Sequence, residues 1–356
     1  MPMLDSLVVS PSMVKQIASI DEFRGSWQAL RAMPEASLTR LLHVATIESI
    51  GSSTRIEGSS LSNAEVDAFL ASLNVRSFQS RDEQEVAGYA DIMHMIFSNW
   101  TAMPFTESTI RQLHRLLLAH SIKDDWHRGD YKTLSNAVSA FDAEGNNLGV
   151  VFQTAEPFDT PRLMADLVEW TNQSLANGPH HPLLVIGAFV ISFLQIHPFQ
   201  DGNGRLSRAL TTLLLLKEGY AYVPYSSLES VIERNKGEYY RTLRQTQMTL
   251  HEERPDWQPW LSFFLSALQR QATHLRIKAE HAIADATSSA LLDPVDLLII
   301  DHVRQQSRVT MAEFIELTNV PRATLKLRLG RLVEANMIVR HGAGRGTWYG
   351  PALTPR

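Results

Sequence analysis

The sequence contains no cysteine, which excludes a fold held by disulfides and a metal site built on thiolates. Its charge is close to balanced, with 33 Lys and Arg residues against 38 Asp and Glu residues and a net charge of −5. A chain of this charge has no general attraction to nucleic acid or to an anionic membrane. No apolar run reaches the roughly 18 residues that a membrane-spanning helix needs.

The first residues also lack the features of a secretory signal, because neither a basic segment nor an apolar core is present there. The chain has no internal repeat and no low-complexity tract. From these absences we expect a cytoplasmic protein that does not enter a membrane. With 356 residues, of which 44% are hydrophobic, the chain is long enough for two or three domains with a substantial core.

One segment concentrates polar and flexible residues between two strongly apolar stretches. It reads HPFQDGNGRLSR and covers residues 197–208, with buried-helix patterns on either side at residues 183–196 and 206–217. Pro198 disfavours a helical conformation at the residue before it, so the first helix should end at the histidine. The glycines allow the backbone to approach a ligand closely, and the second helix should begin near residues 203–205.

These residues suit a nucleotide polyphosphate. Free N–H groups at the start of the second helix, together with the helix dipole, form a site for an anion. Arg205 and Arg208 are three positions apart and so share a helix face toward that anion, and guanidinium groups match phosphate oxygens. Asp201, the only carboxylate of the segment, is the expected ligand of a Mg²⁺ that also binds phosphate. His197 would act as general base on an incoming hydroxyl.

Each of these features has an ordinary structural explanation when it is taken alone. A His-Pro pair commonly ends a helix, a single Gly-x-Gly is a weak signal, and two arginines on a helix are usually solvated. It is their occurrence together in one loop after a buried helix that favours a catalytic site.

The segment resembles the signature of the Fic family, His-x-Phe-x-Asp/Glu-Gly-Asn-Gly-Arg-x-x-Arg, at every fixed position. The resemblance covers roughly residues 19–269 and implies a mostly α fold, a Fic-type helical bundle with a small β-hairpin flap. It implies that the histidine deprotonates a Ser, Thr or Tyr hydroxyl of a protein, to which AMP passes from ATP while pyrophosphate leaves. The site residues implied in this way are His197 as catalytic base, Asp201 as metal ligand, and Gly202, Asn203, Gly204, Arg205 and Arg208 as ATP-binding residues.

Two further features of the segment follow from the resemblance. Relatives that phosphorylate tend to carry Lys at the position of Gly204, so the glycine favours transfer of AMP. Phe199 would pack under the loop without touching the substrate.

A second motif, Ser53-x-x-x-Glu57-Gly58, lies upstream. If the helical pattern of residues 38–50 continues, Ser53 and Glu57 share one helix face and Gly58 suits the helix end. On pattern alone, an ordinary capped helix is the better explanation. The motif also resembles the inhibitory Ser/Thr-x-x-x-Glu-Gly/Asn helix of many Fic proteins, which implies intramolecular inhibition by pairing of Glu57 with Arg208. In some relatives the same glutamate supports removal of AMP, and the sequence leaves that activity open.

Two other regions surround the expected site. Residues 138–141 and 148–152 have the pattern of two short strands joined by a turn, although a surface loop is an equal alternative. The resemblance implies that this flap, residues 138–152, docks a target protein by strand addition. It also places Asn235 and one of the tyrosines Tyr239 and Tyr240 near the adenine, while either tyrosine has an equal chance of lying in the core.

The C-terminal part, residues 286–356, has the pattern of a winged helix-turn-helix domain. Thr310 and Glu313 form a capping-box pattern at the start of its second helix, and residues 337–340 and 347–349 are strand-like. From residue 291 onward nine Lys and Arg residues stand against six Asp and Glu residues. This excess permits contact with DNA phosphates but does not require it, so protein contact and dimerisation stay open.

We therefore expect an N-terminal helical region with the inhibitory helix (1–100), a Fic catalytic core with connecting helices (101–285) and the winged helix (286–356). The leading hypothesis is an autoinhibited nucleotidyltransferase, a protein adenylyltransferase that uses ATP and Mg²⁺ and also modifies itself. The alternatives are removal of AMP or transfer of another nucleotide at the same site, and a DNA-binding regulator with the Fic core as nucleotide sensor. A homodimer is compatible with each of them.

Overall fold

The computed structural model describes residues 4–72, 78, 80–141, 147–290, 293–306, 308–335 and 337–352, with residues 137–141, 147–153, 285–290 and 345 described by their backbone alone. The chain divides into two compact units, Met1–Ala279 and Glu280–Arg356.

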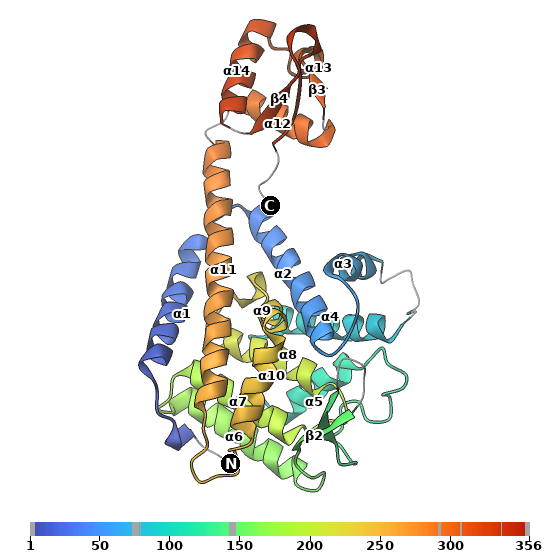
Figure 1. Cartoon of the computed structure of the whole chain (residues 1–356), viewed down its shortest axis with the longest axis vertical. Helices are drawn as coiled ribbons and strands as arrows, with labels where there is room; N and C mark the ends of the chain where they lie inside the picture. The colour runs from blue at the N-terminus through green and yellow to red at the C-terminus, as the bar shows by residue number, and fades with distance from the viewer. Residues whose placement is uncertain are drawn as a thin grey trace. The chain divides into compact units, whose positions relative to one another are not determined.

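The first unit is mostly helical, as expected, and carries one β-hairpin (Figure 1). Its strands are β1 (Ala137–Phe141) and β2 (Asn147–Gln153), and two 3₁₀ turns, η1 (Leu4–Ser6) and η2 (Val223–Tyr225), complete it. The helices are α1 (Pro11–Leu30), α2 (Glu35–Ile56), α3 (Asn63–Ala71), α4 (Arg81–Asn99), α5 (Glu107–Leu117), α6 (Thr160–Asn177), α7 (Pro182–Ile196), α8 (Asn203–Lys217), α9 (Leu228–Arg234), α10 (Lys236–Gln247) and α11 (Gln258–Ala290).

Helices α7 and α8 pack against each other at the centre of this unit (Figure 1). Every residue of α7 from Leu183 to Leu194 is buried, and so is nearly every residue of α8. A helix that is apolar on all sides must lie inside a fold or a membrane. In the described part of the chain, no helix combines the length and the hydropathy that crossing a bilayer requires.

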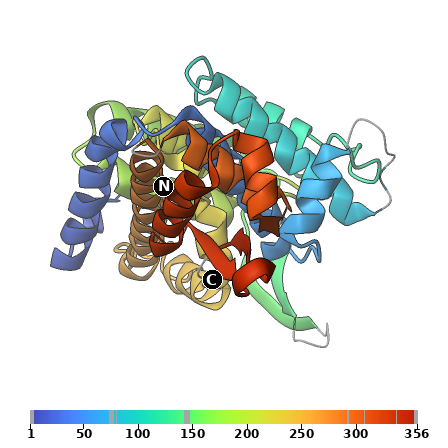
Figure 2. The ribbon, with the colours of Figure 1, turned by 90° about the horizontal axis from the view of Figure 1, so that it is seen from above.

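The helices of residues 1–100 pack with the rest of the first unit. The second half of α2 is buried and packs on α9, while α4 packs on α5 and α8. Helix α1 lies beside α11 (Figures 1 and 2), where the Arg276 guanidinium covers the Phe23 ring at 5.4 Å. The buried sides of α1, α2 and α4 therefore form part of the hydrophobic core around α7 and α8.

The boundary of the first unit differs from the expected one, which lay between residues 285 and 286. The compact unit ends at Ala279, within α11. Because α11 continues unbroken to Ala290, the sequence has no turn signal at the point where the packing changes.

The hairpin of β1 and β2 confirms the two strands expected at residues 138–141 and 148–152. The strands are antiparallel, with Ala137 opposite Gln153 and Phe141 opposite Asn147. The pairing shifts twice along the strands, which is typical of β-bulges and increases the local twist. The expected turn at residues 142–147 lies almost wholly outside the described residues.

In its described residues after α11, the second unit contains three helices and a three-stranded antiparallel sheet in the order β3-β5-β4. Thr310 and Glu313 form the expected capping box at the start of the second helix, and Asn319 ends that helix in a left-handed conformation. The two-residue strand β3 was not expected, and the winged-helix assignment stays a prediction. The elements are α12 (Pro294–Gln306), β3 (Val309–Thr310), α13 (Met311–Thr318), α14 (Arg322–Glu334), β4 (Ile338–His341), η3 (Gly344–Gly346) and β5 (Trp348–Pro351).

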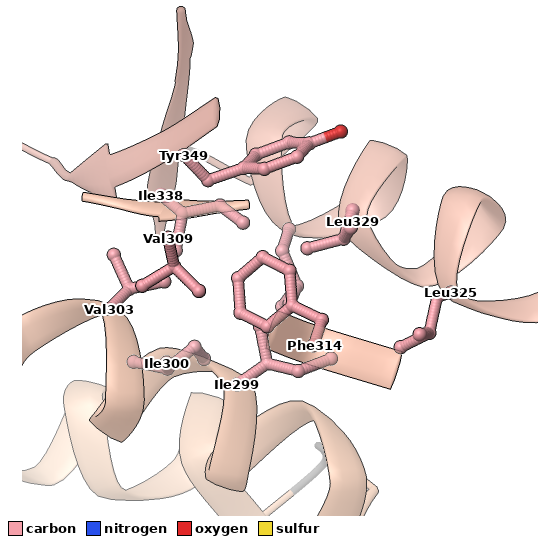
Figure 3. Close-up of a cluster of buried hydrophobic side chains, with 10 residues drawn as sticks. Ile299, Ile300, Val303, Val309, Phe314, Leu325, Leu329, Ile338 and Tyr349 are labelled. Carbon is pink, nitrogen blue, oxygen red and sulfur yellow. The ribbon is translucent and has the colours of Figure 1, made fainter. Parts of the chain in front are cut away.

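This unit has its own hydrophobic core, shown in Figure 3. The fully buried ring of Phe314 lies at its centre, and the Tyr349 ring meets it edge-on with 5.8 Å between the ring centroids. Leu325 and Leu329 contribute from α14, and Ile299 from α12. All three helices and the sheet therefore depend on contacts with one another.

We expect Phe314→Ala to destabilise the second unit by about 3–5 kcal/mol, because the substitution leaves a cavity in the core. That is a large part of the roughly 5–15 kcal/mol that stabilises a typical domain. Hydrogen exchange should show weaker protection of the α14 amides. Leu327→Ala is the control, because this side chain is 72% exposed on the same helix. Equal protection in the two variants would contradict the assignment of the core.

Candidate active site

The active loop, residues 197–202, joins α7 to α8 and has an unusual backbone at both ends. Helix α7 ends at Ile196, and His197 adopts a left-handed conformation with φ 52° and ψ 61°. Its N–H still donates to the Phe193 carbonyl at 2.9 Å, while Pro198 prevents the helix from continuing. Gly202, with φ 80°, begins α8. Both helix ends confirm the expectation from the sequence, and a left-handed backbone is uncommon for a residue with a Cβ such as His197.

The floor of the loop is built by Phe199 and Asn203. The Phe199 ring is fully buried and stacks on the His114 imidazole, with 3.8 Å between the ring centroids. The Asn203 side chain bonds both polar atoms of the Phe199 backbone: its Oδ1 accepts from the N–H at 2.9 Å and its Nδ2 donates to the carbonyl at 2.7 Å. The Asn203 amide is thus engaged in shaping the loop, and its backbone N–H is the group left for a phosphate.

His114 of α5 supports the loop from below. It is fully buried, and its Nδ1 accepts from the Gly129 N–H at 2.8 Å. The other ring nitrogen, Nε2, must therefore carry the proton, which it donates to the Asp201 carbonyl at 3.0 Å. Burial lowers the pKa of this imidazole to about 4, so it is neutral at neutral pH. No sequence pattern marks His114, since a single histidine on an amphipathic helix is common.

The buried state of His114 predicts a loss of stability in acid. Between its ordinary pKa of 6.5 and its folded pKa of about 4, only the unfolded chain binds a proton here. The free energy of unfolding must then fall as the pH falls, by about 2 kcal/mol at about pH 5. Urea denaturation of the wild type and His114→Gln at about pH 7.5 and pH 5 measures this term. The variant should lose less stability than the wild type, and equal losses would contradict the assignment.

His197 has one ring nitrogen engaged by the backbone of α7. Its Nδ1 lies 3.3 Å from the Leu194 carbonyl, which can only accept, so Nδ1 carries the proton. The lone pair is then on Nε2. Burial lowers the pKa of His197 to about 4 and keeps the imidazole in its basic form at neutral pH. The histidine can therefore accept a proton at Nε2.

Lys132 ties the flap to the active loop. Its buried ammonium group donates to the Ile196 carbonyl at 3.0 Å, and to Asn136 Oδ1 and Thr154 Oγ1 at 2.9 Å each. Its own N–H donates to the Pro198 carbonyl at 2.8 Å. Burial lowers the pKa of the lysine to about 8. Both ends of the hairpin are thus fixed to the backbone on either side of His197, a role that the sequence did not reveal.

Asp201 and Arg205 form a charged group at the start of α8. The Asp201 Oδ2 accepts from the Arg81 guanidinium at 2.8 Å and lies 3.7 Å from Arg205 Nη2. Burial alone would raise the pKa of this carboxyl, but Arg205, the Gly202 N–H and Arg81 hold it below its ordinary value. Arg205 is 3% exposed, and its Nε makes no hydrogen bond to any residue that the structure describes. A buried donor of this kind is costly unless a ligand satisfies it.

The donor set at Asp201 fits a magnesium ion that also binds phosphate. Mg²⁺ commonly takes one or two carboxylates and completes its coordination with phosphate oxygens and water. In the described ranges, no cluster of three His, Asp or Glu side chains offers a protein-only site. An ion at Asp201 would therefore depend on phosphate ligands, and it would have to displace the Arg81 guanidinium.

The end of α2 covers Arg208. The guanidinium is 4% exposed; its Nε donates to Ser53 Oγ, and its Nη2 donates to the Ser53 carbonyl, each at 2.9 Å. The same Nη2 donates to Glu57 Oε1 at 2.8 Å. A Cβ on Gly204 would collide with this carboxylate, so Glu57 lies directly on the start of α8. The contact expected between Glu57 and Arg208 is present, and its inhibitory role stays a prediction.

The two arginines of the loop do not share one partner, which differs from the expectation of a single anion face. Arg205 is directed to Glu85 and Asp201, while Arg208 is directed to the residues of α2. Their spacing puts them on one side of α8, but the neighbouring carboxylates separate their guanidinium groups.

The structure separates the two tyrosines expected near the adenine. Tyr239 is 3% exposed, and its ring packs on Trp260 and Phe263 with 5.8 and 5.9 Å between centroids. It belongs to the core, the alternative that the sequence left open. Tyr240 is 43% exposed and its hydroxyl donates to the Ile56 carbonyl at 3.4 Å, beside Glu57. Tyr240 is thus the tyrosine that lies next to the end of α2.

Asn235 bonds residues outside the active loop. Its side chain accepts from Arg270 at 2.9 Å and donates to the Val231 carbonyl at 2.7 Å. It lines a cavity of about 530 Å³ together with Glu238 and Arg241. The expected contact between Asn235 and a nucleotide stays a prediction.

Comparison with known proteins agrees with this geometry. Residues 104–215 match the model of the Fic/DOC family. Among curated proteins, the chain is similar to Protein adenylyltransferase Fic of Drosophila grimshawi, with 27% identity over 232 residues, which cover 65% of this chain and 44% of that protein. The protein of the same name in Drosophila mojavensis is 28% identical over 234 residues, 65% of this chain and 42% of its own. The chain thus spans less than half the length of these curated relatives.

Two solved structures share the fold. A Fic family protein from Desulfovibrio desulfuricans superposes with a TM-score of 0.66 over 99% of both chains, at 24% identity. A Fic domain-containing signalling protein from Bacteroides thetaiotaomicron gives a TM-score of 0.60 and 26% identity over 74% of this chain and 97% of its own. These similarities confirm the mostly helical, Fic-type fold expected from the sequence.

Proposed function

We propose that this protein is a protein adenylyltransferase that transfers AMP from ATP to a hydroxyl group of a protein. The observation that carries the proposal is the state of His197, whose Nδ1 is held by the Leu194 carbonyl so that Nε2 is the basic nitrogen, in the loop that leads directly into α8 with its buried Arg205 and Arg208. The curated relatives named Protein adenylyltransferase Fic support this reaction type.

In the proposed reaction the phosphates of ATP lie at the N-terminus of α8. The N–H groups of residues 203–205 and the helix dipole face them, and no side chain caps this end of the helix. Arg205 offers the unsatisfied donors of its guanidinium. Arg208 binds the outer phosphates once Glu57 has moved away. A Mg²⁺ held at Asp201 would neutralise phosphate charge in the leaving pyrophosphate.

His197 then acts as the general base. Its Nε2 takes the proton of a Ser, Thr or Tyr hydroxyl as the hydroxyl oxygen attacks the α-phosphorus. The bond between the α-phosphorus and the bridging oxygen to the β-phosphorus breaks, and pyrophosphate carries away the electron pair. The proton remains on His197 until solvent removes it.

The target hydroxyl would arrive on the hairpin. The flap, residues 138–152, offers strand edges to an extended segment of the target, which could belong to another protein or to this chain itself. Lys132 fixes both ends of the hairpin to the backbone around His197. A segment paired with the flap would therefore hold its hydroxyl at a fixed distance from the base.

The reaction type can be tested with ATP labelled at either end. Incubation of Glu57→Gly with ATP carrying label on the α-phosphate should give labelled protein, while label on the γ-phosphate should leave the protein unlabelled. Parallel reactions with UTP, GTP and CTP labelled on the α-phosphate test which nucleobase the site accepts. Incorporation of the γ-label would contradict AMP transfer, and stronger incorporation from UTP, GTP or CTP would contradict the choice of ATP.

For the second unit we propose contact with a protein, including a second copy of the chain. The basic surface of α14 is smaller than the charge count indicates, because Arg328 is paired with Asp293 at 2.9 Å and Asp296 at 3.0 Å. Arg322, Lys326 and Arg331 remain exposed. Binding of the full chain to duplex DNA, weakened steeply by salt, would overturn this proposal in favour of DNA.

A further inference from the structure

We propose that Arg55 is a positioning residue that anchors the inhibitory end of α2 to α9 through Glu233, and so determines whether Glu57 reaches Arg208. The inference rests on the proposed function, because it concerns how that activity is held off. Arg55 lies in the last turn of α2, between Ser53 and Glu57. Its contacts point away from the active loop, toward other elements.

Arg55 makes a bidentate contact with Glu233. Arg55 Nε donates to Glu233 Oε1 at 2.6 Å, and Arg55 Nη2 donates to Glu233 Oε2 at 3.0 Å. Two parallel charge-assisted bonds fix the relative orientation of the groups as well as their distance. Both side chains are largely shielded, with exposures of 21% and 27%, so water screens the pair only in part. Burial alone would raise the pKa of Glu233, yet Arg55 and neighbouring donors hold it below its ordinary value.

Arg55 also fixes the chain that follows α2. Its Nη1 donates to the Leu61 carbonyl at 2.8 Å, and its Nη2 donates to Asn63 Oδ1 at 2.9 Å. One guanidinium thus joins the end of α2, the start of α3 and the end of α9.

Gly51 makes room for this arrangement. A Cβ at Gly51 would lie 2.6 Å from Arg55 Nη1 and 2.7 Å from Asn63 Oδ1, both closer than van der Waals contact allows. Glycine inside a helix is less favourable than alanine by about 1 kcal/mol. The guanidinium lying over the helix backbone explains why this buried position carries no side chain.

Besides the bonds of Ser53 and Glu57 to Arg208 itself, two longer contacts hold the last turn of α2. Lys236 Nζ lies 3.5 Å from the Arg55 carbonyl, and the Tyr240 hydroxyl lies 3.4 Å from the Ile56 carbonyl. Glu57 itself follows the helix, with its side chain 32% exposed. The ends of helices open readily when nothing fixes them. Without the Arg55 anchor, the last turn would fray and withdraw Glu57 from Arg208.

The test compares rates of AMP transfer among variants of the full chain. Arg55→Ala, and Glu233→Gln as a change of nearly the same shape, should each raise the rate by about tenfold, as loss of a charge-assisted contact predicts. Adding either change to Glu57→Gly should have no further effect. Arg40→Ala removes an exposed arginine from the same helix and should leave the rate unchanged. Wild-type rates in both anchor variants, beside a faster Glu57→Gly, would overturn the proposal.

Gly51→Ala separates anchoring from helix stability. Alanine favours the helix, so a purely structural role predicts a firmer α2 and a lower rate. Displacement of the Arg55 guanidinium predicts the opposite, a higher rate. A rate at or below that of the wild type would contradict the anchor.

Hydrogen exchange gives a readout that does not need catalysis. The amides of residues 50–58 should exchange faster in Arg55→Ala and Glu233→Gln than in the wild type and Arg40→Ala. If Glu57→Gly transfers no nucleotide at all, the proposed function fails. Hydrogen exchange then tests by itself whether Arg55 anchors the end of α2. Unchanged exchange in both anchor variants would overturn the proposed anchor.

Discussion

Replacing His197 by alanine should lower the rate of AMP transfer by about 10²–10⁴-fold, which is the usual contribution of a general base. The structure gives the physical reason, because the Leu194 carbonyl fixes the proton on Nδ1 and leaves Nε2 to accept the hydroxyl proton. The substitution is best made in the Glu57→Gly variant, where the rate is high enough to follow by release of pyrophosphate. His94→Ala, which removes an exposed histidine of α4, is the matched control.

Measuring the affinity for ATP distinguishes loss of the general base from collapse of the active loop. The left-handed backbone of His197 is fixed by Pro198 and by the bond to Phe193, neither of which involves the imidazole. Calorimetry should therefore give nearly the same affinity for ATP with and without the His197 side chain. A variant that binds ATP normally and transfers AMP at the unsubstituted rate would remove His197 from the mechanism.

Glu57→Gly should raise the rate of AMP transfer by about 10–100-fold, as expected for removal of a largely desolvated contact to a charged group. The glutamate occupies Arg208 and lies against Gly204, so its carboxylate and the outer phosphates compete for the same space. Removing it leaves the Arg208 guanidinium with its two bonds to Ser53 and an open donor for phosphate. Initial rates at saturating ATP measure the effect.

Two companion variants make this second prediction specific. Glu57→Gln keeps the shape of the side chain without its charge, so its rate should lie between those of the wild type and Glu57→Gly. Glu35→Gln changes an exposed carboxylate at the other end of α2 and should have no effect. An unchanged or lower rate in Glu57→Gly would rule out an inhibitory glutamate.

The parts of the fold that the sequence predicted are those with local signals. Pro198 and Gly202 mark the ends of the two central helices, and Thr310 with Glu313 marks the start of α13. Each of these signals acts within a few residues, because capping and backbone preference are local effects. The fully apolar pattern of α7 likewise predicted its central position.

The residues that the sequence did not reveal act across long separations. Arg55 bonds Glu233, His114 bonds the Asp201 carbonyl, and Lys132 holds the end of α7. Only packing of whole helices brings such groups together, and one arginine or histidine on a helix has no pattern of its own. Tertiary packing likewise decided between the alternatives left open for the tyrosines, placing Tyr239 in the core.

Intact-protein mass spectrometry after incubation with ATP and Mg²⁺ tests the central claim most directly. Three proteins suffice: the wild type, Glu57→Gly, and Glu57→Gly combined with His197→Ala. Self-modification is part of the account, which predicts little or no adduct on the wild type, an adduct with the mass of AMP on Glu57→Gly, and none on the combined variant. An AMP adduct of equal yield on all three proteins, or on none of them, would contradict a His197-dependent transferase held off by Glu57.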